Sequence, residues 1–336
     1  MSGVRDLFDR PLRDLRVSVT DRCNLRCDYC MPAEVFGPDH AFVPRAGILT
    51  FEEIVRVVRA AAALGARKVR LTGGEPLLRR NLPALVRLLA AIRGVEDLAL
   101  TTNGLLLAGQ ARELQEAGLH RVTVSLDAWD EGLFRRLTGS SRPVGDVLDG
   151  MRAAARSGLG VKVNCVVQRG VNEDEVLPLA SLCREEGWVL RFIEFMDVGN
   201  HNRWERAAVV PSAVLRDRLQ EAFGLVPAEP ARRGEVARRY CYADGCGEVG
   251  FVSSITEPFC RDCNRARLTA DGRLVTCLFA AGGPDLRSLL RDGTDDHALA
   301  LFMRGVWEGR ADRYSELRAA LPPGKQSKVE MSYVGG

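Results

Sequence analysis

Short apolar runs alternate with longer segments of helical periodicity between residues 14 and 195 of the chain. In the short runs apolar side chains recur at every second position, which is the spacing of β-strands. The predicted strands are 15–19, 68–72, 97–101, 121–126, 160–167 and 189–195. Amphipathic stretches such as 51–64 and 82–92 lie between them, and Thr50 with Glu53 forms a capping box that predicts the start of a helix.

Strand–helix units in this order predict a parallel sheet, which right-handed crossovers curl into an arc. One face of the strands stays polar, as at Arg16, Arg70, Thr123 and Lys162, each between apolar neighbours. A complete eight-stranded barrel fills its interior with apolar side chains. We therefore expect an α/β fold, an incomplete TIM-type (β/α)6 barrel with a polar cavity. The alternative, an amphipathic sheet with one face in solvent, is rare among parallel sheets.

The alternation ends after residue 198, where Gly, Pro and charged residues become frequent. Residues 200–206 and 227–250 are predicted to be loops, followed by strands at 265–268 and 273–276 and helices near 285–291 and 296–308. The expected units are a barrel domain (1–198), a C-terminal α+β domain (199–322) and a flexible tail (323–336).

The ten cysteines change the picture of this 336-residue chain. A chain of this length can bury enough surface to fold without disulfide bonds. The sequence shows neither a signal segment nor an apolar run of about 20 residues. We expect a cytoplasmic protein with no membrane contact, in which clustered thiols bind metal more often than one another. The net charge of +3 forms no basic stripe, which argues against DNA or RNA as a partner.

The first cysteine group, Cys23, Cys27 and Cys30, directly follows the first predicted strand. Four cysteines complete the ligation of a [4Fe–4S] cluster, so three leave one iron open for chemistry. The alternative is a zinc knuckle without its fourth ligand. Zinc motifs favour other spacings, and the nearest histidine is His40, so the spacing favours iron and sulfur.

A second group of three cysteines lies late in the chain and consists of Cys260, Cys263 and Cys277. Of the remaining four, Cys165 and Cys183 fall on apolar or helical positions and are expected in the core. Cys241 and Cys246 lie in a glycine-rich stretch, where one of them could close the second cluster as a fourth ligand.

The first group, with Tyr29 before its last cysteine, and the segment 72–76 (Thr-Gly-Gly-Glu-Pro) resemble the radical S-adenosylmethionine superfamily. With the second group added, the chain resembles the GTP 3′,8-cyclase family of molybdenum cofactor biosynthesis over essentially its whole length. Further segments that carry this resemblance are 13–32, 101–104, 124–127, 191–196 and the terminal Gly-Gly.

This resemblance implies a [4Fe–4S] cluster at each cysteine group, with S-adenosylmethionine on the first and the guanine of GTP on the second. The implied contacts to S-adenosylmethionine are Tyr29, Gly74, Ser125 and Met196. The implied contacts to GTP are Arg16, Arg70, Thr101, Lys162, Arg265, Ala266 and Arg267. The implied catalytic residues are Arg265, Arg267, Gly335 and Gly336. Several of these lie on the polar face of the strands, and arginine suits a triphosphate because it donates in pairs.

The implied reaction converts GTP to (8S)-3′,8-cyclo-7,8-dihydroguanosine 5′-triphosphate, an early step of molybdopterin synthesis. The resemblance further implies an electron donor, a downstream cyclic pyranopterin monophosphate synthase, and a monomer or homodimer. Three alternatives remain at this point: another two-cluster radical enzyme of the peptide-modifying type, a non-catalytic zinc protein, and an iron–sulfur redox sensor.

Overall fold

The structure is a computed structural model that describes residues 3–230, 234–320 and 327–335. Its strands form one 11-stranded sheet in the order β11-β10-β1-β2-β3-β4-β5-β6-β9-β8-β7. The strands are β1 (Asp14–Ser18), β2 (Lys68–Thr72), β3 (Asp97–Thr102), β4 (Arg121–Ser125), β5 (Gly160–Val167), β6 (Val189–Glu194), β7 (Leu225–Ala228), β8 (Arg238–Tyr242), β9 (Glu248–Val252), β10 (Arg265–Leu268) and β11 (Leu274–Val275).

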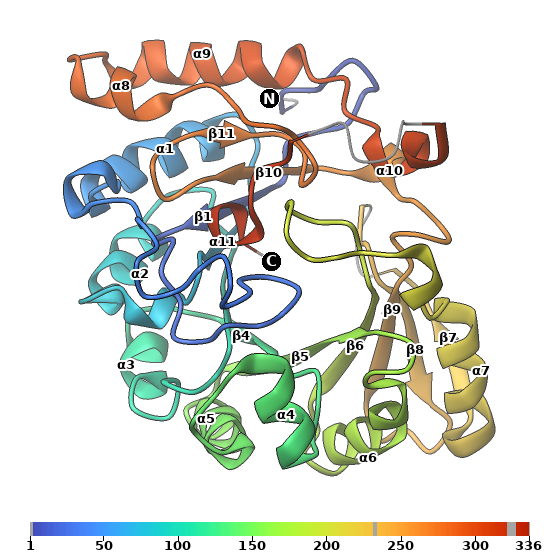
Figure 1. Ribbon diagram of the computed structural model, residues 1–336. Coiled ribbons are helices and arrows are strands. Elements are labelled where there is room, and N and C mark those ends of the chain that lie inside the picture. Colours follow the sequence, from blue (N-terminus) through green and yellow to red (C-terminus); the bar gives the residue numbers. More distant parts are fainter. Residues whose placement is uncertain (1–2, 231–233, 321–326, 336) are drawn as a thin grey trace.

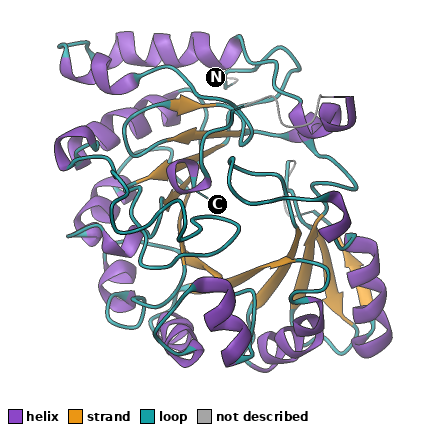
Figure 2. Cartoon of the chain, in the orientation of Figure 1, coloured by secondary structure: helices purple, strands orange, loops and turns teal. Residues whose placement is uncertain are grey.

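The helices lie on the outside of the curved sheet except for α11, which lies in the middle of the open arc (Figures 1 and 2). They are α1 (Phe51–Ala63), α2 (Leu82–Ala90), α3 (Ala111–Glu116), α4 (Glu131–Thr138), α5 (Val144–Arg156), α6 (Val176–Glu185), α7 (Ser212–Phe223), α8 (Leu286–Arg291), α9 (Asp296–Glu308), α10 (Tyr314–Leu317) and α11 (Met331–Val334). The capping box of α1 is confirmed, since the Glu53 amide donates to Thr50 Oγ1 at 3.2 Å and the Thr50 amide to Glu53 Oε2 at 2.7 Å.

The predicted parallel strands are confirmed as β1 to β6, and the barrel is partial. The C-terminal part extends both ends of the same sheet. Strand β10 pairs in parallel with β1, and β9 pairs in parallel with β6. Antiparallel strands then form the edges, β11 beside β10 and the β8–β7 pair beside β9.

The prediction of a continuous loop over residues 227–250 is wrong, because β8 and the first part of β9 lie within it. Leu225 lies opposite Tyr242, and Tyr240 lies opposite Val249. The arginines and glycines that indicated a loop lie between these apolar positions. Strand β9 pairs with β6, and β8 pairs with β9; the partner strand β6 has no signal in the local sequence.

The two faces of the central strands differ as the alternation predicts. Leu15, Val17, Val69 and Leu71 are at most 1% exposed and belong to the apolar core between sheet and helices. Their neighbours on the strands, such as Arg70, lie on the opposite, concave face. In the part of the chain that the structure describes, no helix is both long and apolar enough to cross a bilayer.

The C-terminal segment was predicted to be a flexible tail, and its described part, residues 327–335, is packed against the barrel. Lys328 Nζ lies 2.8 Å from Asp197 Oδ2, and the Lys328 amide donates to Asn200 Oδ1 at 2.8 Å. Helix α11 follows, with Val334 fully buried. Figure 1 shows α11 and the chain end in the middle of the arc. Gly336 lies outside the described residues.

Candidate active site

A cavity of about 610 Å³ occupies the concave side of the sheet. Side chains from β1 to β6 and from the loops that carry both cysteine groups line it. All the thiols of the two groups take part: Cys23, Cys27, Cys30, Cys260, Cys263 and Cys277. The two groups, separated by 230 positions in the sequence, therefore face the same space.

The first cysteine group lies on the loop after β1. This loop turns tightly, because the Cys30 and Met31 amides both donate to the Cys27 carbonyl, at 3.0 and 2.9 Å. Burial raises the pKa of Cys23 to about 11 and that of Cys30 to about 12. Such thiols stay protonated until a cationic ligand displaces their protons, which is how metal binding acts on thiols.

The second group differs in charge environment. Cys263 Sγ lies 3.2 Å from Arg310 Nη2 and 3.4 Å from Arg265 Nη2. Burial acts to raise the pKa of Cys263, but the Arg265 and Arg310 guanidiniums outweigh it and lower that pKa to about 6. Burial raises the pKa of Cys277 to about 11. Unlike Cys277, Cys263 is therefore ionised at neutral pH.

The positions of the thiols indicate whether they could bind a single ion or a cluster. Within the described residues, no three His, Cys, Asp or Glu side chains converge on a point where one ion would sit. The cysteines of a cubane cluster bind different irons and need not converge. Cys241 and Cys246 are exposed and do not line the cavity, so neither is placed to act as a fourth ligand.

The cavity wall between the cysteine groups carries an excess of buried cations. Burial lowers the pKa of Arg70 and Arg267 to about 10, and burial together with both of these neighbours also lowers the pKa of Arg16. Within the described residues, Arg16 Nε, Arg70 Nε and Thr101 Oγ1 have no hydrogen-bond partner. Buried donors and surplus positive charge of this kind fit a polyanionic ligand.

Asp14 is the acidic counterpart of these cations. Its Oδ2 lies 3.0 Å from Lys68 Nζ, and its side chain is 11% exposed. Burial acts to raise the pKa of Asp14, but Lys68, Arg16 and Arg70 outweigh it and hold the pKa well below its ordinary value of 3.8. The negative charge of Asp14 therefore stabilises the folded state above that pH.

Replacing Asp14 with asparagine is expected to lower the free energy of unfolding of the iron-free protein by about 3 kcal/mol at pH 7. The folded-state pKa of Asp14 is depressed, so this contribution begins to decline as the pH falls below the ordinary value of 3.8 and is lost as it falls through the lower folded-state pKa. Urea unfolding of wild type and variant at pH 7 and at about pH 3 measures the difference. Asp9→Asn, in an exposed pair with Arg5, is the control and should cost below about 1 kcal/mol. An equal difference at both pH values would contradict this account of Asp14.

The glycine pair after β2 packs directly on the loop that leads to Cys23. A Cβ at Gly73 would lie 2.3 Å from the Thr20 carbonyl oxygen, and one at Gly74 would lie 2.2 Å from the Arg22 carbonyl oxygen. Only glycine permits this approach. Glu75, 1% exposed, accepts from Thr102 Oγ1 at 2.7 Å and from the Asn103 amide at 2.8 Å.

Most of the predicted site residues line the cavity. Those that do are Tyr29, Gly74, Ser125, Met196, Arg16, Arg70, Thr101, Arg265 and Arg267. Among the described residues three do not: Ala266, Lys162 and Gly335. Ala266 belongs to the apolar core, and Lys162 lies near the start of β5, ahead of Asn164 and Val166, which line the cavity. Burial, with Arg191 and Arg121 nearby, lowers the pKa of Lys162 to about 8. The Gly335 carbonyl lies 3.4 Å from Arg267 Nη1, which places the chain end beside the cation cluster.

Some cavity residues were not singled out in the sequence. Asn164 and Arg191 lie on the polar phase of β5 and β6, so the alternation itself contains their signal. Asn103 and Asp127 follow the ends of β3 and β4, where parallel folds place ligand contacts. Asp127 Oδ2 accepts from Tyr29 Oη at 2.5 Å and thereby links the first cysteine loop to β4.

Comparison with known proteins matches both halves of the chain. The Radical SAM superfamily model matches residues 17–183, and the Molybdenum Cofactor Synthesis C model matches residues 188–316. A protein of Acidothermus cellulolyticus named GTP 3′,8-cyclase is 51% identical, with 99% of each chain covered. Proteins of the same name from Xanthomonas axonopodis pv. citri and Staphylococcus aureus are 54% and 44% identical, again with 99% of each chain covered.

The chain belongs to the GTP 3′,8-cyclase family. This confirms the family resemblance that the cysteine groups and the Gly-Gly-Glu-Pro segment indicated. Among solved structures, SuiB of Streptococcus suis bound to S-adenosylmethionine has a TM-score of 0.59 at 16% identity, and covers 88% of this chain and 68% of its own. At that identity the likeness shows that the GTP 3′,8-cyclase chain shares the radical S-adenosylmethionine fold.

Proposed function

We propose that this chain converts GTP to (8S)-3′,8-cyclo-7,8-dihydroguanosine 5′-triphosphate, an early step of molybdenum cofactor biosynthesis. One observation carries the proposal: two sets of three thiols line one cavity, whose wall also holds buried arginines with unpartnered Nε donors. A zinc protein or a redox sensor needs no such polyanion site. A peptide-modifying enzyme is disfavoured because the named relatives cover the whole chain at 44–54% identity.

The thiols and the cavity fit two [4Fe–4S] clusters and S-adenosylmethionine. Cys23, Cys27 and Cys30 would hold the first cluster, and a second set of cysteines would hold the other: Cys260, Cys263 and Cys277. When bound, the first cluster would supply one-electron cleavage of S-adenosylmethionine to methionine and a 5′-deoxyadenosyl radical, which takes hydrogen from ribose C3′. Tyr29, Gly74, Ser125 and Met196, which line the cavity beside the first group, would orient S-adenosylmethionine.

The chain's own residues would fix the nucleotide between the two groups. Arg16, Arg70 and Thr101 offer unpartnered donors to the triphosphate, and Lys162 would add charge at the far end of β5. The 265–267 segment would hold the base near the second group, with Ala266 contributing its backbone because its side chain points into the outer core. Joining C3′ to C8 of the same nucleotide requires a fixed glycosidic geometry, so anchoring at both ends serves the reaction.

The C-terminal segment would help to close the site. Arg267 Nη1 lies 3.4 Å from the Gly335 carbonyl, and α11 lies across the arc above β1. We infer that Gly335, with Gly336 beyond the described residues, orders Arg267 and excludes water from the cavity. Water exclusion strengthens every charge interaction within such a site.

Anaerobic reconstitution with iron and sulfide tests the proposal. We expect brown protein with about eight irons per chain. Loss of S-adenosylmethionine should then depend on GTP and should not occur with ATP in its place. Colourless protein, about four irons, or cleavage that ignores the nucleotide would contradict the proposal.

Further parts of the account are predictions. We expect an electron donor, delivery of product to a cyclic pyranopterin monophosphate synthase, location in the cytoplasm, and a monomer or homodimer without nucleic acid or membrane as partner. The division into a barrel (1–198), a second-cluster domain (199–322) and a tail (323–336) also remains a prediction.

A further inference from the structure

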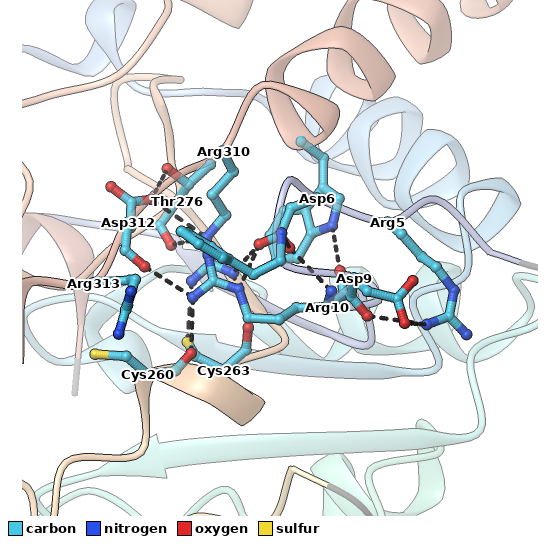
Figure 3. A network of polar contacts seen from close by, with 12 residues as sticks. Arg5, Asp6, Asp9, Arg10, Cys260, Cys263, Thr276, Arg310, Asp312 and Arg313 are labelled. Carbon is cyan, nitrogen blue, oxygen red and sulfur yellow. Dashed lines mark hydrogen bonds and ion pairs between the residues drawn. The ribbon is translucent and has the colours of Figure 1, made fainter. Parts of the chain in front are cut away.

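Arg310 lies buried against the second cysteine group, just after α9 (Figure 3). Its side chain is 1% exposed. Its Nη2 donates to Cys263 Sγ at 3.2 Å, and its Nη1 donates to the Cys263 carbonyl at 2.8 Å. One guanidinium thus holds both the backbone and the sulfur of the same cysteine.

Asp6, on the N-terminal segment, holds Arg310 from the other side. Its Oδ2 accepts from Arg310 Nη1 at 3.0 Å and from Arg10 Nε at 2.6 Å, and its side chain is fully buried. Arg10 Nη1 then donates to the Cys260 carbonyl at 2.8 Å. Residues separated by 304 positions in the sequence therefore form one support for two of the three cysteines.

The charges of this support need a negative partner. Two guanidiniums and one carboxylate, all at most 2% exposed, carry one excess positive charge. Asp312 Oδ2 lies 3.3 Å from Arg310 Nε, but it is 29% exposed and so is partly compensated by solvent. The other anionic neighbour of Arg310 is Cys263 Sγ. A buried charge is stable only when it is paired, so negative charge on this sulfur, which Arg265 Nη2 also contacts at 3.4 Å, offsets the excess.

We propose that Arg310, fixed in place by Asp6, is a positioning residue that aims Cys263 Sγ into the cavity and stabilises the reduced state of the cluster held there. This inference rests on the proposed function, since it requires the second cluster. Hydrogen bonds to the sulfurs of a cluster help to set the reduction potential of that cluster. A positively charged donor favours the reduced state.

The test is a redox titration of the reconstituted full-length protein followed by electron paramagnetic resonance. The signal that persists in a Cys23→Ala, Cys27→Ala, Cys30→Ala variant belongs to the second cluster. Arg310→Gln should lower the midpoint potential of that signal and leave the first cluster unchanged. It should also speed the loss of second-cluster iron to a chelator about tenfold or more. Arg304→Gln, on the exposed face of α9, is the matched control.

Arg310→Lys keeps the inference testable if the glutamine variant does not fold. Lysine retains the charge, so the potential should recover most of its wild-type value. Its single ammonium cannot span Asp6 and Cys263 together, so iron loss should stay faster than in wild type. Wild-type potential and iron retention in a folded Arg310 variant would overturn the inference alone. About four irons in the wild type would overturn the proposed function itself.

Discussion

Replacing Cys27 with alanine is expected to abolish GTP-dependent cleavage of S-adenosylmethionine and to lower the iron content from about eight to about four per chain. Cys27 lies at the centre of the first loop, where its carbonyl accepts from the Cys30 and Met31 amides. Burial raises its thiol pKa well above the usual range, so this sulfur has no role as a free nucleophile at neutral pH. On the proposed function, Cys27 would hold the first cluster together with Cys23 and Cys30.

Two measurements separate this effect from unfolding. The irons that remain in Cys27→Ala should give the signal of the second cluster, because Cys260, Cys263 and Cys277 are unchanged. Cys246→Ala is the matched control, since Cys246 is exposed and lies outside the cavity lining. It should keep about eight irons and full activity. Residual GTP-dependent cleavage in Cys27→Ala would mean that the first group is not the site of S-adenosylmethionine.

Replacing Gly335 with alanine is expected to reduce turnover by about a hundredfold while both clusters remain bound, because small displacements of positioning groups have effects of this size. The φ of Gly335 is +63°, a conformation that costs other residues about 1 kcal/mol or more. An added Cβ would also lie 2.2 Å from Thr72 Cγ2 and 2.4 Å from Thr72 Oγ1. The chain end must therefore move out of the barrel and leave Arg267 without its carbonyl partner.

Gly305→Ala provides the control for this change. Gly305 lies in α9 with open space around its Cα, so alanine fits there without displacement. Turnover, iron content and thermal stability of the two variants should be measured together. If Gly335→Ala keeps wild-type turnover, the C-terminal segment has no part in the reaction.

The sequence predicted those parts of the fold that depend on local spacing. A period of two placed Arg16, Arg70 and Thr101 on the concave face, and the capping box placed the start of α1. The thiols of both groups were identified from their spacing and from the family resemblance. Contacts between distant segments were not predicted. Strand β9 pairs with β6, and β8 and β7 add to β9 in turn, but nothing near residues 227–250 encodes β6 as the partner.

The contacts that support the second cysteine group were not predicted for the same reason. Asp6 and Arg310 resemble ordinary surface residues in the sequence, and only the fold buries them together. The docking of the C-terminal segment depends in turn on Asp197, 131 positions before Lys328. The alternation along the strand placed Lys162 on the polar face of β5. It did not show that this position lies too near the start of the strand to line the cavity.

Hydrogen transfer from GTP labelled with deuterium at ribose C3′ tests the central claim most directly. The reconstituted protein is incubated with the labelled GTP, S-adenosylmethionine and a chemical reductant, and 5′-deoxyadenosine is analysed by mass spectrometry. We predict that one deuterium appears in 5′-deoxyadenosine and that its amount matches the GTP consumed. Unlabelled 5′-deoxyadenosine formed at the same rate with and without GTP would contradict the account.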